Sequence, residues 1–520
     1  MFSWFERAIF RFRKKKYSAY STCEPEESLP LTGDLTADLV SLRSLFSNSS
    51  DFIVRRLEVS GVRMAVLMCE GMINMEMLGK NVIHPITSHR LEREGDRQAL
   101  LEWFRRGSLL APDQQEVTET GDLFRFLMSG FAAILIEGEP RALMLGLQGY
   151  SFRSVAPPES EVNIRGAHEG FVEPIRINLT MIRRRVKSPK LCFELLSGGK
   201  KSKTDLCIVY MTDAALPRLV DEVRRRLKTA DLDIILDSGY LTPFLEDDSG
   251  SLFPTVGVTE RPDTLCAKIN EGRIALLVDG TPYALILPWF FPENFQSLDD
   301  YCYRPLYAAF IRGLKYLSFL VTVLLPGIYV GAATFHPEIL PPVLLYNIAS
   351  AEDTTPFPLM LEAILIHLIY EIMREAGLRL PRAVGHAVSI VGALVIGDAA
   401  VTAGIIGSPM VMVVALTTVS SFVVPSLYES VTVLRFGFIL LGGLFGFYGI
   451  GVGLFLLMMN ICGQTPYGIP YTAPLSPFDS GEMRDVLLRM GWKRLGKRQL
   501  RVQRMVGSEL MGEEKGGRME

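Results

Sequence analysis

A group of ionisable residues lies within apolar stretches of the C-terminal half of the sequence: Glu362, His367, Glu371, Arg374 and Asp398. A charge at the centre of a bilayer costs about 2.5–3.5 kcal/mol, so such side chains face protein or water and often serve ion movement. We predict that these residues form a polar network inside a membrane domain. Asp398 either faces ions or pairs with a basic residue. The candidates for that pairing are His386, His367 and Arg374.

Motifs for catalysis, phosphate binding and metal binding are missing from the sequence. The stretch Gly198–Thr204 has Lys201 where a phosphate-binding loop needs Ser or Thr, and Glu194 stands where that loop needs glycine. The six histidines form no HExxH pair and the seven cysteines form no CxxC pair. We therefore expect no catalytic residues, no enzyme activity, no cofactor and no bound metal ion.

The composition indicates a folded chain with a soluble part and a membrane part. The 520 residues are 48% hydrophobic and 21% charged, which excludes a disordered or fibrous chain. The net charge of -3 gives no reason to expect nucleic acid as a partner. Charges are dense up to about residue 313, whereas long stretches between Tyr316 and Phe478 carry none.

Four apolar stretches are long enough to cross a bilayer as helices, which takes about 20 residues. They are Leu314–Phe335, Ala383–Gly407, Pro409–Leu427 and Phe436–Ile461. A further stretch, Phe357–Leu378, carries several charges and is interpreted as a re-entrant, amphipathic or protein-packed helix. The alternative is five spans with the C-terminus outside.

The distribution of basic residues predicts the orientation of these spans. The N-terminal tail and the C-terminal tail are both rich in Lys and Arg, whereas the loop His336–Pro356 has acids and no basic residue. Because basic segments stay on the cytoplasmic side, both tails are expected inside, which requires an even number of spans.

The soluble half contains two similar stretches, Ala133–Leu145 and Ala275–Leu287. Each has two apolar segments joined by an acid-glycine turn, the pattern of a β-hairpin, although any two hairpins share much of it. We predict two similar α/β lobes followed by an all-α integral membrane domain. The predicted regions are a basic flexible tail at 1–50, lobes at 51–155 and 186–300 joined by a linker at 156–185, a membrane domain at 301–465, and a basic cytosolic tail at 466–520.

The linker ends in a run of three arginines, Arg183–Arg185. One interpretation is that this run contacts lipid phosphates or a partner. The other is that it forms a solvated helix face, which is the commoner role of a charge run.

Several longer motifs resemble a known family. They are Leu344–Pro358, Glu371–Pro381, Ala387–Gly397, Arg165–Gly166 with Glu169–Glu173, and Thr259–Asp263. Together they closely resemble the A subunit of the GerA-type nutrient germinant receptors of bacterial endospores, from about Asp51 to Arg498. The related SpoVAF proteins share this architecture, so a SpoVAF-like accessory subunit is the alternative within the family.

The resemblance implies a multi-pass protein of the spore inner membrane, with its N-terminal domain on the core side, that triggers germination. It implies a receptor in which a permease-like B subunit binds the germinant and a lipoprotein C subunit lies outside. It also implies a homo-oligomer, expected to be a ring of five, that acts as a ligand-gated channel for monovalent cations. Membrane lipid is the remaining expected partner.

Under this resemblance, the stretch Ala383–Gly407 is the candidate pore helix. Steps of three or four residues place a weakly polar series on one face: Ser389, Gly392, Ile396, Ala399, Ala403 and Ile406. Such a face would be narrow, and Ile406 would close it by excluding water. The alternative is a packed span whose small residues serve only helix contacts.

Two other functions remain open from the sequence. A membrane scaffold could relay the germination signal without conducting ions. A solute carrier is weaker, because the inverted repeats of spans typical of carriers are missing.

Overall fold

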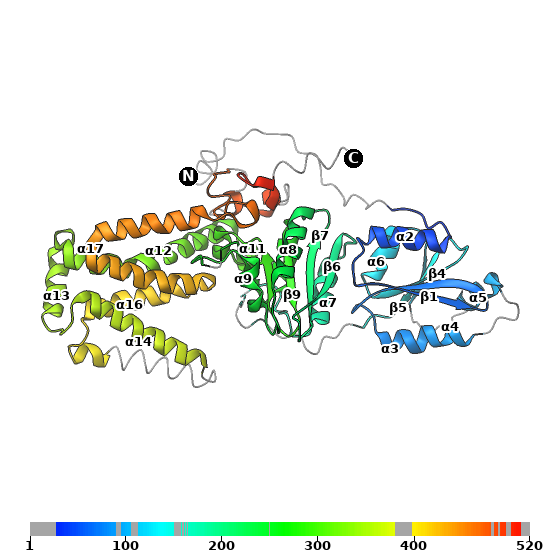
Figure 1. Ribbon diagram of the computed structural model, residues 1–520, viewed down its shortest axis with the longest axis horizontal. Helices are drawn as coiled ribbons and strands as arrows, with labels where there is room; N and C mark the ends of the chain where they lie inside the picture. Colours follow the sequence, from blue (N-terminus) through cyan, green and yellow to red (C-terminus); the bar gives the residue numbers. More distant parts are fainter. Residues whose placement is uncertain are drawn as a thin grey trace. The chain divides into compact units, whose positions relative to one another are not determined.

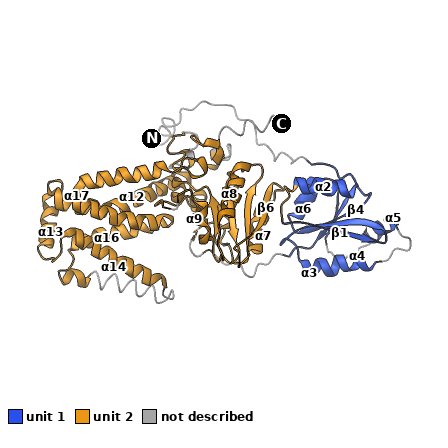
Figure 2. Cartoon of the chain, viewed as in Figure 1, with its two compact units in different colours: residues 1–45, 51–150 blue, residues 46–50, 151–520 orange. Residues whose placement is uncertain are grey.

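The computed structural model describes residues 28–89, 95–105, 113–149, 158, 161, 163, 165–248, 250–379, 398–479, 483–486, 489–495 and 501–510. The chain divides into two units (Figure 2). Unit 1 holds residues 1–45 and 51–150, and unit 2 holds residues 46–50 and 151–520.

Unit 1 contains the first lobe, an antiparallel sheet in the order β1-β2-β4-β5-β3. Its strands are β1 (Phe52–Val59), β2 (Val62–Cys69), β3 (Gln114–Val117), β4 (Phe131–Ile136) and β5 (Ala142–Gly146). Ser60 and Gly61 join β1 to β2 with φ of 49° and 80°, the two positive values that a tight hairpin turn requires. The apolar strands β2 and β4 occupy the sheet interior, where both are almost entirely buried.

Helices pack on this sheet and close the core of the first lobe. They are α2 (Leu35–Leu45), α3 (Met75–Leu78), η1 (Gly79–Ile83), α4 (His84–Ser88), α5 (Arg97–Arg105) and α6 (Thr120–Leu127). One apolar cluster joins the face of β2 and β4 that carries Met64 and Ile134 to α4 and α5, through Ile86 and Leu100. Burial of such side chains is the main term that holds a lobe of this size together.

The second lobe, in unit 2, repeats the strand order of the first. Its strands are β6 (Leu191–Gly198), β7 (Thr204–Met211), β8 (Gly257–Thr259), β9 (Ile274–Val278) and β10 (Ala284–Leu287). Their order is β6-β7-β9-β10-β8, and all neighbours are antiparallel. The turns β4–β5 and β9–β10 hold Gly138 and Gly280 at φ of 78° and 92°. The hairpin similarity seen in the sequence therefore reflects two lobes of one topology.

Helices cover both faces of the second sheet. The elements are α7 (Ile175–Arg185), α8 (Pro217–Thr229), η2 (Ser238–Tyr240), α9 (Thr242–Leu245), α10 (Pro262–Asn270), η3 (Phe291–Phe295) and α11 (Asp299–Cys302). Residues of α7 and α10 pack on one face, and residues of α8 pack on the other (Figure 1). Alternate residues of β7 and β9 thus enter two different cores.

The arginine run of α7 has partners within its own unit. Arg183 is fully buried and donates to Ser49 Oγ at 3.2 Å and to the Leu191 carbonyl at 3.0 Å. Arg184 and Arg185 both bind the Glu169 carboxylate, at 2.7 and 2.5 Å. The interpretation of the run as a solvated face was wrong for Arg183, because its partner Ser49 is distant in the sequence. Contact of the run with lipid phosphates or a partner stays a prediction.

The helical region follows the second lobe. Its main helices are α12 (Pro305–Phe335), α13 (Pro342–Glu352), α14 (Leu359–Arg379), α16 (Ser408–Ser421) and α17 (Tyr428–Gly463). Short elements are η4 (Pro337–Ile339), η5 (Pro425–Leu427), η6 (Pro466–Gly468), η7 (Met483–Asp485), α18 (Trp492–Leu495) and η8 (Val502–Arg504). Among the described residues, two helices are long and apolar enough to cross a membrane, Pro305–Phe335 and Pro425–Gly463. The α16 helix is 14 residues long, about 21 Å at 1.5 Å per residue, so it is shorter than the stretch predicted from Pro409 to Leu427.

The α17 helix reverses direction at Gly446, where φ is 59° and ψ is -144° (Figure 1). In a straight helix Leu441 and Gly453 would lie about 18 Å apart. Instead, a Cβ atom on Gly453 would come within 2.7 Å of Leu441 Cδ1. Phe438 and Leu457, which flank this pair, also share one apolar cluster. The predicted single span Phe436–Ile461 is therefore a hairpin of two antiparallel halves.

The chain enters and leaves the helical region at the second lobe. The α12 helix begins just after α11, and Ser430 at the start of α17 donates its hydroxyl to the Leu252 carbonyl. After α17 ends, Gln464 binds the Ser251 hydroxyl and Tyr467 enters the apolar core under α8. Entry to and exit from the helical region therefore both lie at the second lobe.

The C-terminal segment, the described residues between 464 and 510, completes the second lobe instead of forming a separate tail. Tyr467 donates its hydroxyl to the Leu245 carbonyl at 2.8 Å. Gln503 donates to the Ala214 carbonyl at 2.9 Å, and the Val502 amide donates to the Glu271 carbonyl at 3.0 Å. These contacts place the described part of the predicted basic tail, residues 466–520, against the second lobe.

Candidate functional site

A polar cluster lies between α14 and α17, inside the helical region. Glu371 Oε2 accepts the Tyr428 hydroxyl at 2.6 Å and the Arg374 Nε–H at 3.0 Å. Its other oxygen lies 3.4 Å from the guanidinium of Arg435, which is fully buried. The guanidinium of Arg374 also stacks 3.9 Å over the Tyr428 ring. A single carboxylate thus neutralises two cations where lipid would make each of them costly.

The other members of the predicted network lie elsewhere. Glu362 is buried and accepts the Gly407 amide at 2.7 Å, so it caps the start of α16. His367 is buried and bonds the Ala363 carbonyl through Nδ1 at 2.8 Å. Asp398 is exposed. The structure therefore brings together only Glu371 and Arg374 of the predicted set.

The candidate pore face lies partly outside the described residues. Ser389, Gly392 and Ile396 belong to that part, as does His386. Ala399 and Ala403 are exposed, which suits residues that line a passage or meet a second chain.

Ile406, the predicted gate, lies beyond the end of the helix that carries Ala399. The chain turns at Gly404, with φ of 68°, and the amides of Ile405 and Ile406 both bond the Ala400 carbonyl. Ile406 is 1% exposed and packs in an apolar cluster of its own chain. The helix that carries Ala399 therefore ends before Ile406. Regular helical spacing no longer places Ile406 on the same face as Ala399.

A second charged cluster joins the second lobe, α12 and the C-terminal segment. We call Asp300, Arg312, Asp485 and Arg489 the junction clasp. Arg312 is fully buried and donates to Asp300 at 2.8 Å and to Asp485 at 2.9 Å. Arg489 donates to the carbonyls of Tyr301 and Tyr303 at 2.9 and 3.0 Å. The start of the first long membrane helix is thus held from both sides by charge-assisted bonds.

A buried network beside the clasp links β9 to η3. Arg273 is fully buried and pairs with Glu293, which Lys268 also binds at 2.5 Å. Glu271 lies 3.3 Å from Arg273. Burial raises the pKa of Glu271, and Lys268 and Arg273 oppose this. Burial alone would also raise the pKa of Glu293, but its closer contacts with Arg273 and Lys268 hold that pKa below the usual value.

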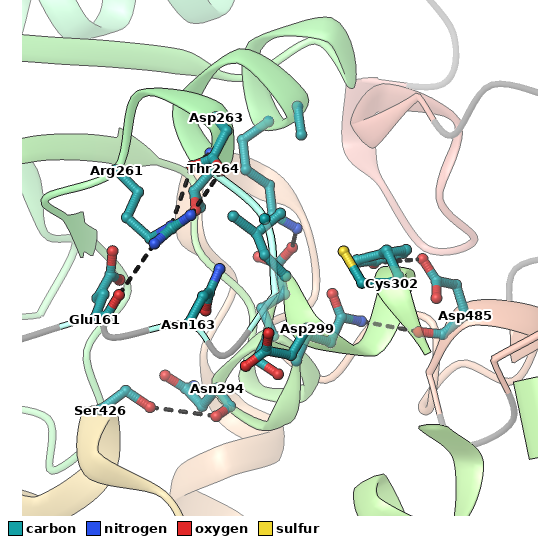
Figure 3. A pocket seen from close by; sticks show the side chains of 18 of the residues that line it. Glu161, Asn163, Arg261, Asp263, Thr264, Asn294, Asp299, Cys302, Ser426 and Asp485 are labelled. Carbon is teal, nitrogen blue, oxygen red and sulfur yellow. Dashed lines mark hydrogen bonds and ion pairs between the residues drawn. The ribbon is translucent and has the colours of Figure 1, made fainter. Parts of the chain in front are cut away.

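A cavity of about 1060 Å³ opens beside these two networks, within unit 2 (Figure 3). Its walls come from Glu161 and Asn163, from α10, η3 and α11, from η5 and from the C-terminal segment. Figure 3 shows Arg261 between Glu161 and Asp263, with Asn163 near them. The volume matches that of pockets which bind small organic molecules.

The sequence matches the family described as Bacillus/Clostridium GerA spore germination protein over residues 40–500. The chain belongs to the GerA family of spore germination proteins. This result confirms the resemblance found in the motifs.

Relatives within the GerA family align over most of their length. Spore germination protein KA of Bacillus subtilis (strain 168) is 37% identical over 476 residues, 90% of this chain and 87% of the relative. The membrane protein YfkQ of the same organism is 35% identical over 489 residues, 94% of each chain. The N-terminal domain of the A subunit of the Bacillus megaterium spore germinant receptor GerK3 is 29% identical, with a TM-score of 0.41, over 51% of this chain and 99% of that one.

Several residues of this GerA-family protein that carry the two charged clusters were missed in the sequence. Arg435 stands one residue before the predicted span Phe436–Ile461 and was not included in the predicted network. Arg435 lies at the edge of a long uncharged run, and this position could have identified it as a member of the polar cluster. Arg312 and Asp485 lie far apart in the sequence and carry no local signal of their pairing.

Proposed function

We propose that this GerA-family membrane protein is the A subunit of a nutrient germinant receptor, acting with a permease-like B subunit and a lipoprotein C subunit. In this proposal it forms a homo-oligomeric ring in the spore inner membrane, with its lobes on the core side, and passes monovalent cations when the receptor is triggered. The pentameric ring is the form we favour.

The observation that carries this proposal is that hydrogen bonds and ion pairs attach the second lobe to the helical region. The junction clasp fixes the start of α12, and Ser430 and Gln464 fix both ends of α17 to the same lobe. A rearrangement of the lobe therefore reaches the membrane helices directly. A change of this kind needs a differential contact in the two states, and buried ion pairs can supply one.

The pore residues remain part of the proposal. Ser389, Gly392, Ile396, Ala399 and Ala403 are proposed to face the axis of the ring, where small side chains allow close packing. Ile406 is the weakest member, because it packs within its own chain. That packing is the observation that favours the second candidate function, a SpoVAF-like or scaffold subunit that relays the signal and conducts nothing.

Ion flux from liposomes separates these two functions. The purified chain, alone and with its B and C subunits, is reconstituted in vesicles loaded with K⁺, and its oligomeric mass is measured in parallel. We expect K⁺ efflux from vesicles that hold a closed oligomer, and loss of this efflux when Ser389→Cys is modified with a bulky charged thiol reagent. Oligomers that never pass K⁺ with or without the other subunits would favour the scaffold.

A further inference from the structure

Three of the four basic side chains of the described cavity wall have acidic partners, and the fourth, Arg165, lies 5.8 Å over the Tyr303 ring. Arg261 pairs with Asp263 at 2.8 Å and also donates to the Ala167 carbonyl at 2.7 Å. Lys268 pairs with Glu293 at 2.5 Å, and Lys315 lies 3.5 Å from Asp300. An anionic ligand would have to compete with these internal carboxylates, so the wall does not favour one.

One carboxylate of the wall is differently placed. Glu161 Oε2 accepts a hydrogen bond from the Thr259 hydroxyl at 2.6 Å. Arg261 donates to the backbone carbonyl of Glu161 at 3.2 Å while its ion pair goes to Asp263. The Thr259 hydroxyl and the Glu260 backbone N–H thus hold the Glu161 carboxylate, and a ligand ammonium can add to these neutral donors. Burial raises the pKa of Glu161, the Thr259 hydrogen bond and the Arg261 charge oppose that rise, and a bound cation would oppose it further.

A buried amide beside this carboxylate lacks a partner. Asn163 is 8% exposed, lines the cavity, and its Nδ2 donates no hydrogen bond in the described structure. A buried donor without an acceptor costs about 1–3 kcal/mol. A ligand oxygen placed against Asn163 Nδ2 would accept this hydrogen bond and remove that cost. The amide therefore favours a ligand that carries a hydrogen-bond acceptor.

Part of the remaining wall is apolar. Trp289 directs its indole N–H to Asn294 Oδ1 at 3.1 Å, and Lys268 and Arg273 lie over its ring at 5.5 and 5.9 Å. Val258 and Leu298 line the same cavity. Aromatic and aliphatic walls with a few fixed polar groups are the usual composition of a small-molecule site.

We propose that this cavity binds a small organic solute that presents a primary ammonium to Glu161, a hydroxyl or carbonyl oxygen to Asn163 and an apolar group to the wall near Trp289. The site lies where the second lobe, η5 and the C-terminal segment meet, so an occupant would stabilise that junction. The proposal goes beyond the receptor function and does not depend on ion conduction.

Binding of L-phenylalaninol to the purified full chain in detergent micelles tests the proposal by calorimetry. This probe carries the ammonium, the hydroxyl and the apolar group together. N-acetyl-L-phenylalaninol lacks the positive charge and should bind about tenfold more weakly or worse, as expected for the loss of a charge-assisted hydrogen bond. Phenethylamine lacks the oxygen and should bind several-fold more weakly.

Two variants assign the contacts. Glu161→Gln should weaken L-phenylalaninol about tenfold and reduce the difference from its N-acetyl form. Asn163→Ala should make L-phenylalaninol and phenethylamine bind alike. Asp231→Asn, at an exposed carboxylate outside the cavity, is the matched control and should leave binding unchanged.

Three results would overturn the proposal. The first is no detectable binding of L-phenylalaninol to a folded, monodisperse chain. The second is equal affinity for the N-acetyl form, which needs no variant and so is independent of any folding defect. The third is unchanged binding by both Glu161→Gln and Asn163→Ala.

Discussion

The two lobes share one strand order and differ in what they bury. In the described part of unit 1 the buried acidic and basic side chains are Asp38 and Asp51, and its ion pairs, such as Arg63–Glu137, lie at the surface. The second lobe buries Arg183 and Arg273 completely. One sheet topology therefore serves two purposes, an apolar core in the first lobe and a charged junction with the membrane helices in the second.

This difference has an energetic reason. Surface ion pairs contribute about 0–1 kcal/mol, and a lobe built on apolar burial needs none of them. A buried pair gains little over an apolar replacement, but loss of one partner is severe because the other charge stays buried. Buried pairs thus make the second lobe sensitive to any movement of α12 or the C-terminal segment.

The largest effect is expected for Arg273→Met. This change leaves Glu293 buried with Lys268 as its remaining cation, and breaking such a pair costs about 3–5 kcal/mol. We expect a clear loss of the free energy of unfolding, measured by denaturant titration of the full chain in detergent. The matched control in the first lobe, Arg141→Met, removes a half-exposed pair with Glu116 and should change stability by less than about 1 kcal/mol. Equal effects at both sites would remove the contrast between the lobes.

The reversal of α17 predicts an asymmetry between two glycines. Gly446→Ala forces a side chain into a left-handed conformation, within 3.0 Å of Phe335 Cβ, and should cost about 1–2 kcal/mol or more. Gly437→Ala meets nothing within 4 Å and should be neutral or stabilising by up to about 1 kcal/mol. Thermal unfolding in detergent compares the two. A disulfide between Leu441→Cys and Gly453→Cys should also form, and its failure would indicate a straight helix.

Release of the junction clasp should expose the C-terminal segment. Asp485→Asn removes the charge that faces Arg312, and its side chain is 26% exposed, so we expect a loss of about 1–2 kcal/mol. Cleavage near Arg489 by trypsin should then become about tenfold faster, since local opening controls the rate. Asp479→Asn, in the same segment outside the clasp, is the control. Equal cleavage of both variants would show that the clasp does not hold the segment.

The smallest effect concerns the surface of the second lobe. Arg225 and Arg226 lower the pKa of Glu222 to about 2, and burial opposes this shift. A carboxylate with a lowered pKa stabilises the fold above its unfolded value, and this stabilisation is lost as pH falls from about 4.5 toward 2. Between pH 5 and 3, the free energy of unfolding of Glu222→Gln should therefore fall less than that of the parent. The difference should be less than about 1 kcal/mol, because the pair is partly solvated. Identical pH profiles would contradict this.

The lobes could be predicted because their signals are local. Gly138 and Gly280 sit in short turns between apolar strands, and this pattern needs only a dozen neighbouring residues. The burial of Arg183 could not be predicted, because Ser49 and Leu191 become its partners only in the folded chain. The arginine run looked like a solvated face for the same reason.

The helical region shows a similar limit. Uniform hydropathy from Phe436 to Ile461 indicates a membrane segment but conceals the reversal at Gly446, one of several glycines in that stretch. Two residues of the polar cluster were predicted from the sequence. Glu371 and Arg374 lie one turn apart on α14, whereas Arg435 comes from a different helix.

The C-terminal segment returns to the second lobe, where Gln503 Nε2 lies 2.9 Å from the Ala214 carbonyl. Disulfide trapping between Ala214→Cys and Gln503→Cys, in a chain otherwise free of cysteine and kept in native membranes, tests this arrangement directly. We predict rapid cross-linking of the two positions. A folded chain in which no cross-link forms would contradict this arrangement.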